Sequence, residues 1–377
     1  MDKYKKALRS VFVLGLIYLF LVSIEFIGKG AGLLGAGFAR HLISTTSDPV
    51  IGLFIGILVT VVVQSSSLTT SLVVALVGGG IMNLQCAVPI IMGANVGTTV
   101  TNAIVSLGHI SWRNEFKRAF AAATVHDIFN ILTLIIVFPL ELKFHYLTKI
   151  ALLLQRVFEN IGGFHFTSPI KVLLAPPIKF FKFFLLQVLS LSEKISGSLI
   201  IILGLLFLFM SLIILVKILR KMFIGEAELL IDKYIFRTSL LAMFIGFVIT
   251  AIVQSSSLTT SVIVPLAAAG IVGLERIFPY TLGANVGTTF TALLASLAVS
   301  GEGRAAALAA ALAHLCFNLT GIAIFYPFRF MRRIPVYLAE KLSAQCAKRR
   351  YFALIFVLTV FVVIPLTVIF LEKTVWR

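Results

Sequence analysis

Two short segments of the chain carry the same run of polar side chains within apolar surroundings: QSSSLTTS occurs at 64–71 and again at 254–261. Consecutive serines offer hydroxyl and backbone N–H donors, and glutamine offers donors and an acceptor oxygen. At a break between two half-helices, these groups would meet the positive ends of helix dipoles, which attract anions. The alternative is a seam of small residues packed between membrane helices. The exact duplication favours an anion site.

A second motif, GANVGTT, is also duplicated, at 93–99 and 283–289. Its glycines permit unwound backbone, whose carbonyls, together with Asn and Thr oxygens, suit a hard cation such as Na⁺. A nucleotide-binding glycine loop is excluded because the motif lacks the Lys-Ser/Thr ending. Neither motif contains Lys or Arg, so an oxyanion bound here would need co-bound Na⁺ to balance its charge. Each ion would then raise the affinity for the other.

Asp127 lies beside His126 inside an apolar stretch. A carboxylate within a membrane span is a candidate functional group by default. It could complete a cation site, or it could pair with His126 or a neighbouring hydroxyl. The histidine recurs as His314, and Asn130 and Asn318 follow one helical turn after the two histidines. For this duplicated set, hydrogen bonds that brace helices are favoured over catalysis.

The composition is that of a membrane protein. Of the 377 residues, 59% are hydrophobic and only 12% are charged, and the mean hydropathy is +1.07. This excludes a cytosolic enzyme and a secreted disulfide scaffold. The net charge is +17, and the basic residues cluster at the ends of apolar spans. This distribution indicates a role in membrane topology and in contacts with anionic lipid head groups rather than nucleic-acid binding. The three cysteines show no metal or redox spacing.

Several apolar segments are long enough to cross a bilayer. The first follows a basic N-terminus but lacks a clear cleavage site, so it is predicted to be a transmembrane helix rather than a signal peptide. The stretches around 50–110 and 240–300 are apolar but interrupted by polar residues and glycine, which membranes tolerate only where protein or a polar cavity covers them. The predicted spans lie near 10–28, 117–140, 197–219, 305–328 and 352–371.

The chain contains an internal repeat, since 54–103 aligns without gaps to 244–293 with about half of the positions identical. Basic residues precede the first apolar helix of copy one but follow the corresponding helix of copy two, so the positive-inside rule orients the copies oppositely. We therefore predict an all-α polytopic membrane protein of two inverted-topology repeats, with broken or re-entrant helices meeting at the midplane. The basic groups compared are Lys3, Lys5, Lys6 and Arg9 in copy one and Lys217, Arg220 and Lys221 in copy two.

The predicted organisation has four parts. Inverted repeat 1 covers 10–140, an extracytoplasmic loop with short helices covers 141–196, and inverted repeat 2 covers 197–328. A cytoplasmic basic segment and a final transmembrane helix cover 329–377. The expected location is the cell (inner or plasma) membrane, as a multi-pass protein with a cytoplasmic N-terminus.

These motifs resemble the type II sodium-dependent inorganic phosphate cotransporters. The resemblance rests on the doubled QSSS motif, PIIMGANVGTTVTNAIVSLG at 89–108, RAFAAATVHDIFN at 118–130 and GLERIFPYTLGANVGTTFTALLASLA at 273–298. It implies a symporter, not an enzyme, that couples inward Na⁺ movement to uptake of inorganic phosphate by alternating access. The implied partners are phosphate, Na⁺ and the lipid bilayer, with no cofactor beyond the transported Na⁺ and no nucleic acid; the oligomeric state stays open.

The resemblance also assigns site residues. The QSSS positions line the phosphate and sodium sites, and the second motif supplies neighbouring ligands. The phosphate set is Ser65, Ser66, Ser67, Ser255, Ser256, Ser257, Asn95 and Asn285, and the sodium set is Gln64, Gln254, Thr98, Thr288, Ser67, Ser257 and Asp127.

The chain departs from the family at one informative position. Electrogenic members of the family carry an Asp just before the Arg of the loop that follows the first GANVGTT motif. Here that position is Trp112. The missing carboxylate implies fewer coupled sodium ions and favours electroneutral transport. The loop 141–196 is also short and free of cysteine, which resembles bacterial members.

Three other functions are weighed against symport. A channel could use the same polar midplane, but channels usually arrange charges or carbonyls around an oligomer axis. An intramembrane hydrolase could pair a serine with His126 and Asp127, but adjacent residues point to different helix faces and the Asp is not duplicated. Another oxyanion such as arsenate, almost isosteric with phosphate, could also be carried.

Overall fold

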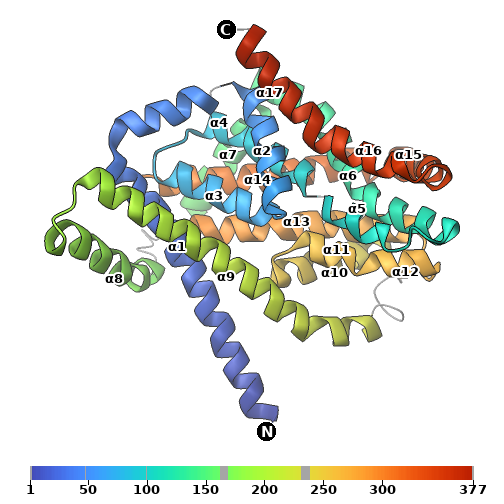
Figure 1. The fold of residues 1–377 in the computed structure, drawn as a ribbon, viewed down its shortest axis with the longest axis horizontal. Helices are drawn as coiled ribbons and strands as arrows, with labels where there is room; N and C mark the ends of the chain where they lie inside the picture. Colours follow the sequence, from blue (N-terminus) through green and yellow to red (C-terminus); the bar gives the residue numbers. More distant parts are fainter. Residues whose placement is uncertain (1, 47, 99, 162–168, 231–237, 376–377) are drawn as a thin grey trace.

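The structure is a computed structural model that describes residues 2–46, 48–98, 100–161, 169–230 and 238–375. Within these ranges all regular structure is helical, which confirms the all-α prediction. The helices are α1 (Asp2–Thr46), α2 (Pro49–Val63), α3 (Ser66–Gly78), α4 (Leu84–Gly97), α5 (Val100–Leu107), α6 (Arg113–Phe144), α7 (Tyr146–Ile161), α8 (Pro169–Phe183), η1 (Phe184–Val188), α9 (Glu193–Leu230), α10 (Ser239–Val253), α11 (Ser256–Ser261), α12 (Ile263–Ala269), α13 (Leu274–Ala298), α14 (Arg304–Phe325), α15 (Arg329–Lys348), α16 (Tyr351–Leu358), η3 (Thr359–Val363) and α17 (Ile364–Val375) (Figure 1).

Six helical segments within the described residues are long and apolar enough to cross a membrane. Five of them overlap the spans predicted from the sequence. The sixth, Leu84–Leu107, falls in the stretch that was expected to be interrupted by polar residues and glycine. The other segments are Val11–Leu34, Arg113–Phe144, Glu193–Leu215, Arg304–Phe325 and Tyr351–Glu372.

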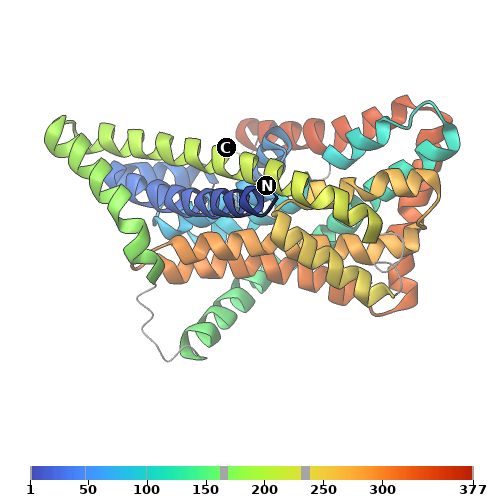
Figure 2. The same ribbon diagram turned by 90° about the horizontal axis from the view of Figure 1, so that it is seen from below.

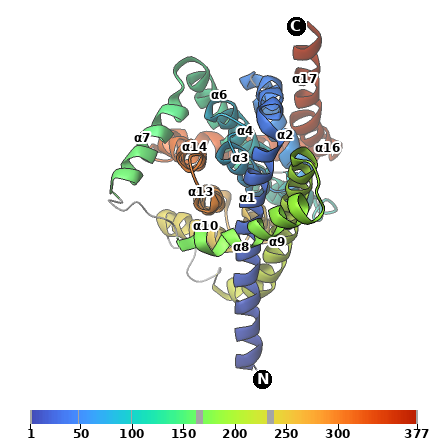
Figure 3. The same cartoon turned by 90° about the vertical axis from the view of Figure 1, so that its left-hand side faces the viewer.

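The centre of the molecule is formed by helices from both sequence copies. Figures 2 and 3 show α13 and α14 running between the pair α1 and α9 on one side and α7 on the other. The aromatic ring of Phe129 on α6 packs against Phe278 on α13 and Phe325, with ring centroids 5.9 and 6.0 Å apart. These buried contacts join α6 of the first copy to the helices of the second copy.

The glycine motif packs helices together instead of unwinding them. Gly93 lies within α4 against the carbonyl of Leu53 on α2, and Gly283 lies within α13 against the carbonyl of Met243 on α10. Neither position has room for a Cβ. The expected unwound backbone is therefore wrong from Gly283 to Thr289, which stay helical, and from residue 93 to 97; Thr99 lies outside the described residues.

The segment after α6 carries short helices, as its mixed composition indicates. His145 ends α6 in a left-handed conformation (φ 51°), and α7 begins at the next residue. The buried carboxylate of Glu141 accepts hydrogen bonds from the backbone N–H groups of Leu147 (2.6 Å) and Thr148 (3.3 Å). A negative side chain at a helix N-terminus satisfies donors that the helix itself leaves unpaired.

Candidate functional site

Both QSSS motifs lie at breaks between helices, and the two breaks have the same geometry. Gln64 ends α2 with φ 57° and ψ 28°, and Gln254 ends α10 with the same values. Ser65 and Ser255 follow in extended conformation, and α3 and α11 begin at the next residue. A left-handed glutamine is uncommon, so its occurrence in both copies indicates that the break belongs to the motif. The break predicted from the sequence is present twice.

The first serine of each motif caps the helix that follows. The Ser65 hydroxyl accepts a hydrogen bond from the Leu68 backbone N–H at 3.2 Å, and Ser255 accepts from Leu258 N–H at 3.3 Å. Serine at an N-cap satisfies one of the donors left free in the first helical turn. These two hydroxyls therefore hold the starts of α3 and α11.

This capping role predicts a modest loss of stability. We expect Ser65→Ala to lower stability by about 0.5–2 kcal/mol, because the first turn of α3 loses its cap, whereas Ser65→Asn retains it. The thermal unfolding midpoint in detergent checks this. Equal midpoints for the alanine variant and the unmodified protein would contradict the capping role.

The two breaks touch each other, although the motifs are 190 positions apart in the numbering. The Ser67 hydroxyl donates to the Gln254 backbone carbonyl at 3.1 Å. Ser66, Ser67 and Ser256 are each 3% exposed and Ser257 is 7% exposed. The structure thus brings the two QSSS motifs together at one buried place.

Several polar side-chain atoms of the two QSSS motifs have unused hydrogen-bonding capacity. Within the described residues, the hydroxyls of Ser66, Ser256 and Ser257 donate no hydrogen bond, and the side-chain oxygen Oε1 of buried Gln254 has no partner. The equivalent Gln64 is exposed, and its amide donates to the Val61 carbonyl at 2.5 Å. The three serine hydroxyls can donate to an acceptor, whereas the Gln254 oxygen can only accept a hydrogen bond or coordinate a cation.

The threonines of the GANVGTT motif bond within their own helices. The Thr98 hydroxyl donates to the Ala94 carbonyl and the Thr288 hydroxyl to the Ala284 carbonyl, both at 3.0 Å. Both side chains are buried. Since a donating hydroxyl keeps its oxygen lone pairs, these oxygens can still accept a cation.

The asparagines of the motif contact the duplicated histidines of the opposite copy. His126 on α6 hydrogen-bonds through Nε2 to the Asn285 side-chain oxygen on α13, and His314 on α14 does so to the Asn95 oxygen on α4, at 3.2 Å. Asn285 also donates to the Asn130 side-chain oxygen at 2.8 Å. The histidines therefore brace helices, as the sequence favoured. No hydrogen bond joins Asn95 or Asn285 to a QSSS serine among the described residues.

These contacts bear on the hydrolase alternative. The Nε2 atom of His126 is used by an asparagine, and its Nδ1 atom has no partner within the described part of the chain. No serine–histidine pair is therefore formed by the residues that the structure describes. Asp127 is fully buried beside His126 on α6.

One polar residue of this region escaped the sequence interpretation. The Asn102 amide on α5 donates to the Thr260 hydroxyl on α11 at 2.7 Å, and its own Oδ1 atom is buried without a partner in the described residues. Its position in copy two is Ala292, so duplication gave no signal. A buried polar side chain in an apolar helix was the one available indication.

Comparison with known proteins identifies the family. The sequence model of the Na⁺/Pi-cotransporter family matches residues 19–165 and 206–336. The chain belongs to the Na⁺/Pi-cotransporter family. This membership, with six helices able to span a membrane, makes it a multi-pass membrane protein.

Two relatives of this Na⁺/Pi-cotransporter family member are animal proteins. The chain is 34% identical over 455 residues to sodium-dependent phosphate transport protein 2B of Homo sapiens, covering 98% of this chain and 66% of the relative. It is 34% identical over 439 residues to protein 2A of Rattus norvegicus, covering 99% of this chain and 69% of the relative. The chain therefore spans about two thirds of the length of these relatives. No solved structure matches.

Proposed function

We propose that the chain is a secondary active symporter, without enzymatic activity, that couples inward Na⁺ movement to uptake of inorganic phosphate. The observation that carries the proposal is the contact between the two QSSS breaks, where Ser67 donates to the Gln254 carbonyl. Two helix N-termini and several unused hydroxyls meet there, and both features suit an oxyanion. The relatives named as sodium-dependent phosphate transport proteins support phosphate and Na⁺ as the substrates.

The proposed phosphate ligands are chiefly the hydroxyls that the protein leaves unused. In this proposal Ser66, Ser256 and Ser257 donate to phosphate oxygens, and Ser65 and Ser255 hold the adjacent helix starts. Asn95 and Asn285 act through the histidine contacts that fix α4 and α13. Ser67 completes the proposed phosphate set; its hydroxyl donates to the Gln254 carbonyl in this structure.

The proposed sodium ligands are neutral side-chain oxygens of the two motifs, together with the carboxylate of Asp127. No Lys or Arg occurs in either motif, so a bound phosphate would repel further negative charge and attract Na⁺. Cooperative binding of the two ions follows from this charge balance. The set is Gln64, Gln254, Thr98, Thr288, Ser67, Ser257 and Asp127.

We further propose that inverted repeats provide alternating access in the cell membrane, with the N-terminus in the cytoplasm. The basic residues before the first span support this orientation. The two glutamines support distinct states of the two halves, because Gln254 is 5% exposed whereas Gln64 is exposed. In alternating access each half would take both states in turn.

Uptake of radiolabelled phosphate into proteoliposomes tests this function. With an inward Na⁺ gradient we expect accumulation above equilibrium, and with matched K⁺ or choline we expect none. Flux that only follows the phosphate gradient, whatever the cation, would indicate a channel instead. Competition by arsenate would show how strictly the site selects phosphate.

We also propose that transport is electroneutral. Trp112 occupies the N-cap of α6 with no capping hydrogen bond, and it is 61% exposed. Tryptophan has no carboxylate, whereas the family resemblance implies an Asp at this position in electrogenic members. We expect no net charge movement per phosphate in potential-clamped liposomes; net inward positive charge during uptake would contradict the proposal.

A further inference from the structure

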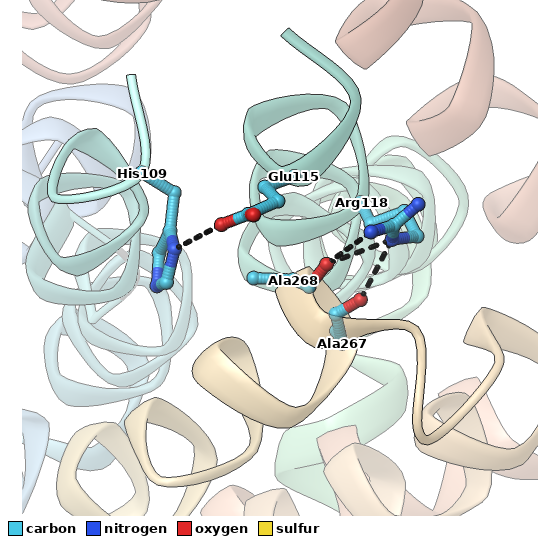
Figure 4. A network of polar contacts seen from close by, with 5 residues as sticks. All are labelled: His109, Glu115, Arg118, Ala267 and Ala268. Atoms are coloured by element: carbon cyan, nitrogen blue, oxygen red, sulfur yellow. Dashed lines mark hydrogen bonds and ion pairs between the residues drawn. The ribbon is translucent and has the colours of Figure 1, made fainter. Parts of the chain in front are cut away.

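The short helices that begin with the second QSSS motif are held at their far end by an arginine of the first copy. Arg118 on α6 donates through Nε to the carbonyls of Ala267 (3.2 Å) and Ala268 (2.8 Å). Its Nη2 atom donates to the Ala268 carbonyl at 2.5 Å (Figure 4). Gly270 then ends α12 in a left-handed conformation with φ 78°. The guanidinium thus caps the C-terminus of α12.

Close helix packing brings this guanidinium within reach. Ala119 and Ala123 on α6 pack against Val264 and Ala268 on α12, and all four side chains are buried. Small side chains let two helix backbones approach closely. A cation at a helix C-terminus also interacts favourably with the helix dipole, and the planar arginine fork can serve several carbonyls at once.

A cavity of ≈460 Å³ lies beside this contact. Its lining includes Lys117, Arg118, Val272 and Glu340. Val272, which follows α12, is only 6% exposed. Any movement of the end of α12 away from α6 would therefore widen this cavity and uncover Val272.

The corresponding end of α3 in the first copy is held differently. There the carbonyl of Gly78 lies against Gly303, with no room for a Cβ between them. The position equivalent to Arg118 is Ala306. One copy is thus held by direct backbone contact and the other by a charged side chain.

We propose that Arg118 is a positioning residue that fixes the second QSSS segment against the first copy and thereby sets the phosphate affinity of Ser256 and Ser257. The transport part of this proposal rests on the proposed function, whereas the structural part does not. Without the hydrogen bonds from Arg118, α11 and α12 could move as a unit, because they are consecutive helices separated only by Val262.

Cysteine labelling tests directly whether the hydrogen bonds from Arg118 hold the end of α12. Val272→Cys is introduced into the full chain, whose native cysteines at 86, 316 and 346 are buried. With Arg118→Gln, we expect its reaction with a water-soluble maleimide to accelerate on the order of tenfold, since hydrogen bonds from a charged donor are lost. Lys117→Gln is the matched control, because Lys117 lines the same cavity but makes no hydrogen bond or ion pair within the described residues. We expect it to leave the rate unchanged.

The conservative variant separates positioning from folding. Arg118→Lys keeps a cation at the end of α12. We therefore expect the cysteine of Val272→Cys to react at a rate between those measured with Arg118 and with Arg118→Gln. In uptake assays we expect Arg118→Gln to raise the phosphate KM severalfold with little change in maximal rate, and Arg118→Lys to recover part of the affinity. Equal labelling in all variants would overturn the proposal. Accelerated labelling without any phosphate uptake by the unmodified protein would support the role of Arg118 in holding α12 and would refute the symporter.

Discussion

Replacing Ser66 and Ser256 together with alanine is expected to abolish Na⁺-driven phosphate uptake. These hydroxyls are buried at the contact between the two breaks and are unused by the protein within its described residues. A hydrogen bond to a charged group contributes about 1.5–3 kcal/mol. Loss of two such bonds therefore lowers phosphate affinity roughly 10²–10⁴-fold.

The serine prediction is checked by initial uptake rates over a range of phosphate concentrations. Each single variant should lose part of the affinity, with both motifs contributing. Ser198→Ala is a suitable control, because Ser198 is exposed on α9 and donates only to its own helix, to the Lys194 carbonyl at 2.9 Å. Unchanged uptake by the double variant would remove the QSSS contact from the phosphate site.

The largest effect on stability is expected from Gly283→Ala. A Cβ at this position would overlap the Met243 carbonyl, so α10 and α13 would have to separate. Overpacking of this kind typically costs about 1–3 kcal/mol, and more where backbone must move. Gly93→Ala should behave alike, because its Cβ would overlap the Leu53 carbonyl in the equivalent helix pair.

Thermal unfolding in detergent and the monodisperse fraction after purification measure this effect. Gly15→Ala serves as the control, since no atom lies within 4 Å of the added Cβ and alanine favours a helix more than glycine does. We expect the control to match or exceed the unmodified protein. A normal unfolding midpoint for Gly283→Ala would show that α10 and α13 pack less closely than the structure indicates.

Part of this architecture could be predicted from the sequence because the polar motifs occur twice. The duplication of QSSS indicated a break, and the structure places one after Gln64 and another after Gln254. The duplicated His and Asn residues indicated helix bracing, and both histidines accordingly bond to asparagines. Repeated polar residues in an apolar chain carry such a signal because each copy must satisfy the same buried groups.

The remainder depended on contacts that no local pattern reveals. Glycine allows both unwinding and close packing, and the sequence around Gly283 does not show that Met243 lies against it. In the sequence, Arg118 is one of several basic residues that follow the first GANVGTT motif. Nothing in that pattern shows that its guanidinium donates to carbonyls 149 and 150 positions away. Asn102 has no counterpart in copy two. Their roles follow from tertiary packing between the two copies.

The central claim is that one site, formed where the QSSS motifs meet, binds phosphate and Na⁺ together. Radioactive Na⁺ uptake into proteoliposomes, measured with and without external phosphate, tests it most directly because coupling between two ligands is reciprocal. We predict that phosphate stimulates Na⁺ uptake by the unmodified protein and not by the variant carrying Ser66→Ala and Ser256→Ala. Na⁺ uptake that is independent of phosphate, or equally stimulated in that variant, would contradict the shared site.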